Sequence, residues 1–390
     1  MKNLALCCDG TANEFAENQT NVVKLYSMME QDPARQVTYY HPGLGTMEPA
    51  GALTTFSRKL TKLLGMALGY GLANDIRDAY VFLMQNFTEG DNIFLFGFSR
   101  GAYTVRAVAS LLHMYGLIRP GNESLVPYAI RMLTSINRDG GNSAGDQAAK
   151  SRYFELAREF KATLSRVNCR PLFVGVWDTV SSVGWVENPL KLPYVTNNPD
   201  IHIGRQALSI DERRAFFRNH LWRRPDDASV PWGPMDVQQV WFPGVHCDVG
   251  GGYAEAESGL SKIALEWMVA EAMVAGLLVN CVKRDEVLAK TPGTRFIAPD
   301  PNGVVHESLK GAWNLAEFVW KKHYDWKTGT ERWGMNLYRR RLIPENALVH
   351  ESAFQRGGGY SNRLPPSSVR VTTRHVSRTY ESSGNDKRVP

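Results

Sequence analysis

The sequence has no run of about 18 consecutive apolar residues, the length that a membrane-spanning helix needs. Its first apolar stretch, residues 3–8, is too short for the hydrophobic part of a signal peptide. The five cysteines follow no spacing that is typical of a metal site, and their odd number does not indicate a disulfide framework. We therefore expect a cytoplasmic protein with reduced thiols, no resident metal and no cofactor.

Charge of one sign is not in large excess either. The 45 Lys and Arg residues against 39 Asp and Glu give a net charge of +6, too little to favour a nucleic-acid partner. The tail, residues 355–390, holds seven of the basic residues against two acidic ones, and we expect it to be solvated and partly flexible. Sixteen Phe, fifteen Tyr and ten Trp argue against disorder over most of the chain.

A Gly-x-Ser-x-Gly motif is present in the right context for a nucleophile. Residues 92–98 form an apolar run of strand length that ends in Gly97-Phe98-Ser99-Arg100-Gly101, and residues 102–116 have helical spacing. Strand, sharp turn and helix are what a nucleophile elbow requires, because the serine hydroxyl must point out of the fold. The alternative is an ordinary turn in which Ser99 caps the helix.

Five apolar runs predict the strands of a mostly parallel sheet buried on both faces. They are residues 4–9, 36–41, 92–98, 171–178 and 237–245. Helical patterns are found at residues 21–30, 72–87, 102–116, 151–165 and 260–279. Alternating strands and helices favour an α/β fold, and each predicted strand ends in polar or glycine-rich residues, as expected for a site at the carboxyl edge of a sheet.

Insertions interrupt this pattern and suggest a division of the chain. We predict a catalytic domain over residues 1–284 with insertions at 46–71 and 184–236, a helical and aromatic extension or cap over 285–354, and the basic tail over 355–390. The first insertion has an apolar stripe opposite basic residues, so it is a candidate for contact with a membrane surface as well as for packing on its own domain. In the second insertion, the pattern of residues 209–221 predicts a helix.

A serine nucleophile needs an imidazole base and a carboxylate that orients the imidazole. In α/β-hydrolases these follow in the order Ser, acid, His, and here Asp178 and His246 each end a predicted strand after Ser99. Asp248 is a rival acid, although its place before three glycines is typical of a turn residue. His41 precedes the serine, so it is predicted to line the pocket.

An oxyanion hole needs two backbone amides. The amide of Arg100 is one candidate, and the loop after the first strand, with Gly10 and Thr11, supplies the other. Asp9 in the same loop is expected to hold its turn or line the pocket. With Asp248 and His246 it also forms a possible oxygen-rich metal cluster, which leaves open a metal-dependent hydrolase that uses Asp9 and Asp248.

Six sequence motifs follow one another in order over roughly residues 1–280. They are Cys8-Asp9-Gly10-Thr11-Ala12-Asn13, the Gly-Leu-Gly-Thr of residues 43–46, Gly97-Phe98-Ser99-Arg100-Gly101-Ala102-Tyr103, Gly175-Val176-Trp177-Asp178-Thr179-Val180, Asp211-Glu212-Arg213-Arg214, and residues 244–253 from Gly244 to Tyr253. In these motifs the chain resembles the α/β-hydrolase family that includes the Tle1-type phospholipase effectors of bacterial type VI secretion. The resemblance implies that the family's triad falls on Ser99, Asp178 and His246.

The resemblance implies a serine ester hydrolase, most concretely a phospholipase of type A that works through an acyl-enzyme. It also implies an ester or phospholipid substrate, a secretion-apparatus or immunity protein as partner, and export by type VI secretion. A second hypothesis from another class is a non-catalytic adaptor of a secretion system that uses the basic tail and the aromatic C-terminal region.

Overall fold

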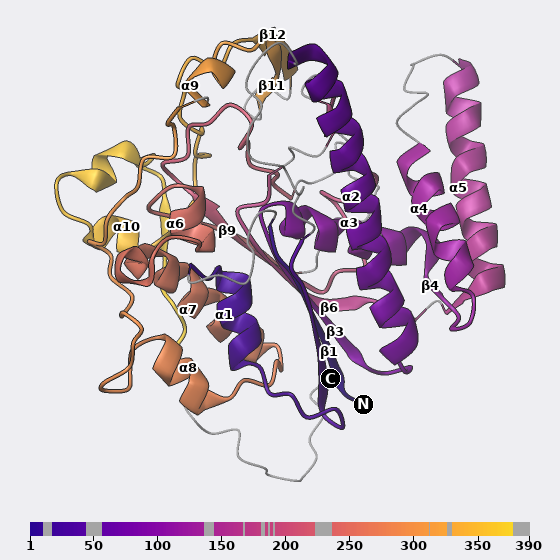
Figure 1. The fold of residues 1–390 in the computed structure, drawn as a ribbon, viewed down its shortest axis with the longest axis horizontal. Coiled ribbons are helices and arrows are strands. Elements are labelled where there is room, and N and C mark those ends of the chain that lie inside the picture. Colours follow the sequence, from indigo (N-terminus) through magenta and orange to yellow (C-terminus); the bar gives the residue numbers. More distant parts are fainter. Residues whose placement is uncertain are drawn as a thin grey trace.

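The computed structural model describes residues 1–10, 18–43, 57–135, 144–166, 168–180, 184–185, 188–189, 192–222, 236–311, 313–325 and 330–376. One eight-stranded sheet lies at its centre, with helices on both faces (Figure 1). The strands of this sheet are β1 (Asn3–Cys8), β2 (Gln36–His41), β3 (Asn92–Phe98), β6 (Pro171–Trp177), β9 (Ile203–Ser209), β10 (Asp236–Phe242), β13 (Leu348–His350) and β14 (Val369–Val371). The helices are α1 (Asn21–Met28), α2 (Ser57–Asn86), α3 (Arg100–Tyr115), α4 (Val126–Ser135), α5 (Ala144–Leu164), α6 (His246–Gly250), α7 (Gly259–Val274), α8 (Cys281–Val287), α9 (Trp313–Ala316) and α10 (Ser352–Gln355). Two-stranded ribbons pair β4 (Leu117–Ile118) with β5 (Ser165–Arg166), β7 (Gly184–Trp185) with β8 (Asn188–Pro189), and β11 (Lys321–Asp325) with β12 (Thr330–Gly334).

The strand order β14-β13-β10-β9-β6-β3-β1-β2 places the functional strand ends together. All seven neighbouring pairs are parallel, which confirms the predicted α/β-hydrolase-like fold. From β1 the chain continues to β2 on one side and to β3 on the other, so a topological switch point lies between β1 and β3. Open parallel sheets bind their ligands outside the carboxyl ends of the strands at such a point. All five predicted strands are present, as β1, β2, β3, β6 and β10.

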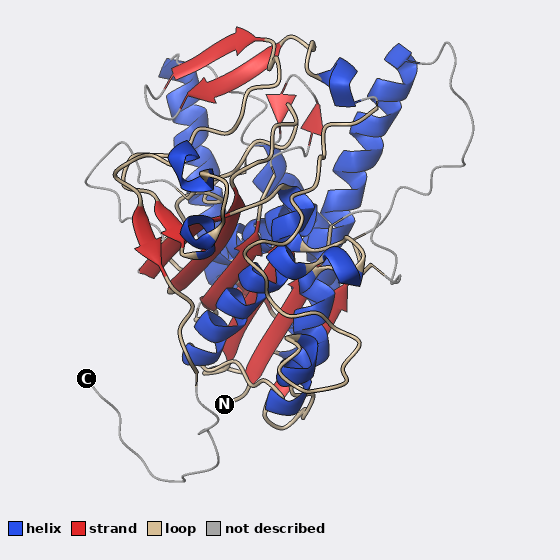
Figure 2. Ribbon diagram, turned by 90° about the vertical axis from the view of Figure 1, so that its left-hand side faces the viewer, coloured by secondary structure: helices blue, strands red, loops and turns tan. Residues whose placement is uncertain are grey.

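The two faces of the sheet are buried in two separate cores, and β3 shows why its sequence is continuously apolar. Alternate residues of a strand point to opposite faces. Ile93 and Leu95 pack under α2, α3 and α4, whereas Phe94 and Phe96 pack under α1, α7 and α8. Figure 2 shows the strands side by side with helices in front of them and behind them. A strand covered on both faces needs apolar residues at every position.

The segment from residue 203 to 222 differs from the prediction. Residues 209–221 were predicted as a helix, but β9 ends at Ser209 and residues 210–222 form a loop without helix. β9 is not a continuous apolar run, because it contains Arg205 and Gln206, and both of these side chains are buried in the middle of the sheet. Arg205 can be buried there because Glu271 on α7 accepts from its Nε at 2.6 Å.

The C-terminal part adds β13 and β14 to the edge of the large sheet beyond β10. Residues 285–354 therefore contain short helices, the β11–β12 ribbon and a strand of the main sheet. The division into domains stays a prediction. Of the insertion predicted at 46–71, residues 46–56 lie outside the described part, and residues 57–71 belong to α2, which runs on without a break to Asn86.

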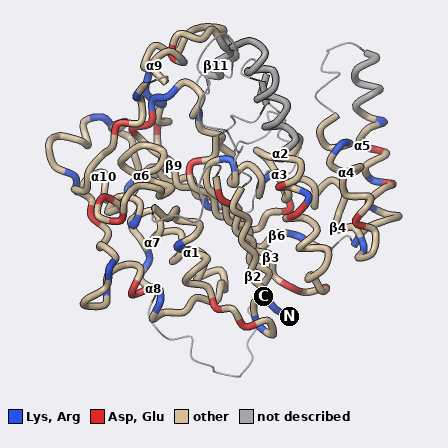
Figure 3. The backbone as a smooth tube through the Cα atoms, viewed as in Figure 1, with Lys and Arg blue, Asp and Glu red and all other residues tan. Residues whose placement is uncertain are grey.

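Acidic and basic residues are interspersed along the described backbone rather than gathered on separate faces (Figure 3). This distribution agrees with the small net charge of the sequence. None of the helices in the described ranges combines the length and the apolar character that a bilayer crossing requires.

Candidate active site

Ser99 lies on the turn between β3 and α3, in a strained backbone conformation. Its φ is 56° and its ψ is −118°, a region that residues other than glycine rarely occupy. The turn is held by the Ser99 amide, which donates to the Trp177 carbonyl on the neighbouring strand at 3.1 Å. The Ser99 side chain makes no capping hydrogen bond to α3, so the hydroxyl does not serve as an ordinary helix cap. This is the geometry of a nucleophile elbow.

The two glycines of the motif are required by close backbone contacts. A Cβ on Gly101 would lie 2.1 Å from the Cys8 carbonyl oxygen, and a Cβ on Gly97 would lie 2.5 Å from the Gly101 carbonyl oxygen. Real Cβ atoms do not approach that closely, so both positions need glycine. The same contact shows that the end of β1 presses against the first turn of α3, next to Ser99.

Asp178 follows β6, the strand beside β3, and is completely buried. Its carboxylate accepts from the amide and the hydroxyl of Ser209, both at 3.0 Å, and from Nδ1 of His246 at 2.6 Å. Both terminal guanidinium nitrogens of Arg341, Nη1 and Nη2, donate to it as well, Nη2 at 3.0 Å. Burial alone would raise the pKa of the Asp178 carboxyl, but the Arg341 charge and the His246 hydrogen bond outweigh burial and hold that pKa well below its usual range.

His246 begins α6, which follows β10, and its ring is buried between two aromatic rings. The ring centroid lies 4.6 Å from that of Phe98, the residue before Ser99, and 4.9 Å from that of Phe217. Gly250 makes room for this stack, because a Cβ there would lie 1.9 Å from the Phe98 ring. Burial lowers the pKa of the His246 imidazole even though Asp178 opposes that shift. A neutral imidazole whose Nδ1 is bonded to Asp178 has Nε2 left to accept a proton.

The structure thus brings Asp178 and His246 into direct contact and places the His246 ring against the residue that precedes Ser99. Comparison with known proteins covers the same region. Residues 2–271 match the family model described as "T6SS, Phospholipase effector Tle1-like, catalytic domain". The chain belongs to this family.

The individual relatives of this Tle1-like chain are longer proteins, and the two of known structure share little sequence identity with it. Saccharomyces cerevisiae protein YEL023C, an uncharacterised protein, is 36% identical over 226 residues, which cover 56% of this chain and 32% of the yeast protein. An uncharacterised Pseudomonas aeruginosa protein of known structure is 21% identical with a TM-score of 0.40, over 71% of this chain and 46% of that one. A Tle1 effector solved bound to the VgrG spike of the type VI secretion system is 18% identical with a TM-score of 0.34, over 66% of this chain and 53% of that one. The chain thus spans about a third of the yeast relative's length and about half that of each solved chain.

The candidate oxyanion donors of this Tle1-like domain lie on both sides of the switch point. Arg100 is the first residue of α3, so its amide has no acceptor within the helix. The Gly10 amide donates to the Asp9 carboxylate at 2.7 Å. An oxyanion at Gly10 would have to share that donor or displace the carboxylate. Thr11 lies outside the described residues.

Asp9, His41 and Asp248 each support the loop that carries them. The Asp9 carboxylate also accepts from the Thr20 hydroxyl at 2.6 Å, and Nδ1 of His41 accepts from the Gly43 amide at 3.1 Å. Asp248 accepts from the Val245 amide at 2.9 Å and from Nδ1 of His306 at 2.6 Å, which is the turn role that its position indicates. Among the described residues, no three His, Cys, Asp or Glu side chains are grouped so that they could hold a metal ion.

Sequence reasoning missed the groups that support Asp178 and His246. Ser209 and Glu212 lie at and just after the end of β9, and Glu212 accepts from the His246 amide at 3.2 Å. Burial would raise the pKa of Glu212, but hydrogen bonds and charge from Arg214 lower that pKa to about 2. The Asp211-Glu212-Arg213-Arg214 motif was a signal for this loop. For Arg341, which is 163 positions away from Asp178, the sequence contains no local signal.

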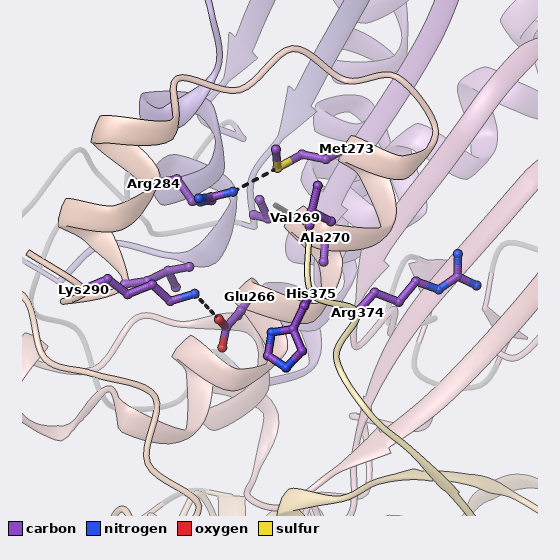
Figure 4. Close-up of a pocket in the computed structure, with 10 residues that line it drawn as sticks. Glu266, Val269, Ala270, Met273, Arg284, Lys290, Arg374 and His375 are labelled. Carbon is purple, nitrogen blue, oxygen red and sulfur yellow. Dashed lines mark hydrogen bonds and ion pairs between the residues drawn. The ribbon is translucent and has the colours of Figure 1, made fainter. Parts of the chain in front are cut away.

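A pocket on the outer side of α7 and α8 is separate from this site (Figure 4). It is lined by residues of α7, α8 and the C-terminal segment and includes none of Ser99, Asp178 and His246. Its charged groups are already paired, for example Lys290 with Glu266 at 2.5 Å. The pocket therefore offers no unpaired charge of its own for a ligand and is not the candidate site.

Proposed function

We propose that this protein is a serine phospholipase of type A, which hydrolyses an acyl ester of a phospholipid through an acyl-enzyme. The observation that carries the proposal is the buried Asp178–His246 pair, whose imidazole packs on Phe98 beside the strained Ser99. Family membership favours a phospholipid among the possible esters.

In the proposed reaction, the Ser99 hydroxyl oxygen attacks the acyl carbonyl carbon while Nε2 of His246 takes the hydroxyl proton. The Arg100 amide donates to the oxygen that becomes negative, and a second donor comes from the loop after β1. His246 then passes its proton to the leaving alcohol oxygen, and the ester bond breaks. A water molecule, deprotonated by the same imidazole, releases the fatty acid from Ser99.

The supporting groups account for the protonation states that this reaction needs. Burial keeps the His246 imidazole neutral in the resting enzyme, so it is ready to act as a base. Asp178 stays ionised because Arg341 and Ser209 satisfy its other lone pairs. It fixes the imidazole with Nδ1 protonated and stabilises the imidazolium that forms in the transition state.

The test combines covalent labelling with turnover. The wild-type protein is expected to react with a fluorophosphonate probe and to release fatty acid from a panel of phospholipids and short-chain esters. Ser99→Ala should not be labelled and should lose roughly 10⁴-fold or more of the turnover. Ser27→Ala, at an exposed position of α1, is the matched control and should behave like the wild type.

Folded wild-type protein that neither reacts with the probe nor hydrolyses any ester of the panel would overturn this proposal and favour the adaptor hypothesis. Export through a type VI spike, an immunity protein as partner and membrane contact through residues 46–71 belong to the same proposal. Co-purification of the protein with the VgrG spike protein of its own cell would test the first of these.

A further inference from the structure

Exposed apolar side chains are concentrated in one short stretch of the chain. Nine of the sixteen large hydrophobic side chains that are exposed among the described residues lie between residues 313 and 342. Soluble proteins rarely leave so many together without a function for them. We call these nine the 313–342 apolar surface: Trp313, Leu315, Phe318, Trp320, Trp333, Met335, Leu337, Tyr338 and Leu342.

This surface lies on α9, the β11–β12 ribbon and the loop that follows the ribbon. Figure 1 shows α9 and the ribbon at the top of the molecule, on the side of the sheet where the strands end and α2 begins, and Figure 2 shows the ribbon at the same end. The Ser99 turn and His246 follow strands of that same edge. The exposed side chains thus stand on the side of the molecule from which a substrate would reach the candidate site.

A buried carboxylate fixes this surface to the loop below it. Glu317 is completely buried and accepts from the Ala215 amide at 2.6 Å and from the Tyr338 amide at 2.9 Å. Asn336 adds a hydrogen bond to the Arg213 carbonyl at 2.8 Å. Because two parts of the surface are tied to residues 213–215, its apolar side chains are held outward by a defined scaffold rather than by a loose loop.

The surface is continuous with the candidate site through aromatic contacts. The Trp313 ring lies edge-on to the Phe217 ring, with centroids 5.3 Å apart, and Phe217 lies edge-on to His246 at 4.9 Å. The Arg214 guanidinium covers the Phe217 ring at 3.4 Å. The surface and the His246 imidazole are thus linked by packed rings, with the Arg214 guanidinium on one face of Phe217.

Charge on the surface fits an anionic lipid layer. Arg339 and Arg340 lie between Tyr338 and Leu342 and are exposed, although Arg340 also lies 3.5 Å from the Asp211 carboxylate. Trp and Tyr are the side chains that settle at the level of lipid headgroups, and basic residues beside them are attracted to anionic lipids. Trp, Tyr and Arg are common in protein interfaces as well. What favours a lipid layer here is the position of the surface, whose Trp313 ring is linked through Phe217 to His246 of the candidate site.

We propose that the 313–342 apolar surface docks the protein on a phospholipid bilayer that contains anionic lipid, so that the candidate site faces the lipid layer. The use of docking for catalysis rests on the proposed phospholipase function, but the docking itself can be measured without any reaction.

The experiment is co-sedimentation with vesicles of phosphatidylglycerol and phosphatidylcholine in equal parts, in the Ser99→Ala background so that the lipid is not consumed. Phe318→Ser with Trp320→Ser removes two side chains that are 51% and 59% exposed. The control, Tyr128→Ser with Val282→Ser, removes side chains that are 52% and 77% exposed on α4 and α8. We expect the first pair to weaken vesicle binding by about tenfold for each side chain removed, and the control to bind normally.

Two further measurements separate a loss of docking from damage to the candidate site, and the contribution of charge from that of apolar contact. With Ser99 intact, the Phe318→Ser and Trp320→Ser protein should hydrolyse a soluble short-chain ester at the wild-type rate and lose activity on vesicles. Arg339→Glu should weaken binding to anionic vesicles more than binding to pure phosphatidylcholine. Equal vesicle binding by the two double variants would overturn the proposal, and so would concentration-dependent self-association through this surface. Vesicle binding by a protein that hydrolyses no ester would instead overturn the proposed function and leave the docking in place.

Discussion

The guanidinium of Arg341 forms a two-pronged ion pair with the carboxylate of Asp178, and its Nη2 shares the oxygen Oδ2 with Nδ1 of His246. Both side chains are buried, with exposed fractions of 1% and 0%. Nη1 of Arg341 also donates to the Ser209 hydroxyl at 2.6 Å. Arg341 lies outside the residues matched by the family model, which end at 271. The Asp178 carboxylate that holds His246 in place is therefore also bound by Arg341, a cation from the C-terminal part of the chain.

Removal of this cation should change the pH dependence of catalysis. In Arg341→Gln the Asp178 carboxylate loses its nearest positive charge, so the imidazolium form of His246 becomes more stable and the pKa of His246 rises. Activity requires neutral His246, and the acid limb of kcat/KM should therefore move to higher pH. The measurement is kcat/KM against pH on a soluble ester. Because one partner of a buried pair is lost, the free energy of unfolding should also fall, by about 3–5 kcal/mol.

Arg341→Lys keeps the charge without the two-pronged geometry, and its acid limb should lie between those of the wild type and Arg341→Gln. The control is Arg340→Gln, whose side chain is 51% exposed and 3.5 Å from Asp211. An acid limb that stays in place while turnover falls would show that Arg341 acts through packing and not through charge.

The wild-type acid limb is itself a prediction. Burial lowers the pKa of His246 below its ordinary value of about 6.5, so activity should persist below that pH and fall as the imidazole becomes protonated. An acid limb above the ordinary histidine range would contradict this expectation.

The carboxylate of Asp178 should be essential for turnover. Asp178→Asn should lower kcat by about 10⁴-fold, because an amide stabilises the wrong imidazole tautomer. A small effect of Asp178→Asn on kcat would contradict the role proposed for this residue.

Two glycines in helices should respond in opposite ways to alanine. Gly101→Ala places a Cβ 2.1 Å from the Cys8 carbonyl oxygen, and neither backbone can move without distorting the turn at Ser99. We expect loss of several kcal/mol of stability, as in other overpacked cores, and loss of activity. Gly71→Ala in α2 meets nothing within 4 Å and should stabilise the protein by about 0.5–1 kcal/mol. Urea unfolding of both variants tests the pair, and similar midpoints would refute it.

Treatment with EDTA should leave ester hydrolysis unchanged. Both carboxylates of the metal hypothesis already accept hydrogen bonds, Asp9 from Thr20 and Gly10, and Asp248 from Val245 and His306. A metal ion would have to displace these donors. Turnover on a soluble ester before and after dialysis against EDTA is the measurement, and a loss that a divalent cation restores would establish the metal-dependent hypothesis.

The elements that could be predicted are those whose own residues dictate them. A strand such as β3, covered on both faces, must be apolar throughout, so its run of residues marks it without knowledge of its neighbours. Parallel strands that alternate with helices must bring their carboxyl ends to one edge. For that reason Ser99, Asp178 and His246 could be selected from their places after strands and from their order along the chain.

The elements that could not be predicted depend on partners far away in the sequence. β9 has the polarity of a surface segment, and it is a central strand because Glu271 and Asp236 neutralise Arg205 at 2.6 Å each. Arg341 looks like one of three consecutive surface arginines, yet it is the one that is buried against Asp178. Local periodicity reports which face of an element is apolar, whereas the pairing of buried charges is decided when distant segments meet. The sequence by itself determined five strands of the sheet and the order of the candidate site residues, and the tertiary structure decided how β9, β13 and β14 complete the sheet and which charges support the site.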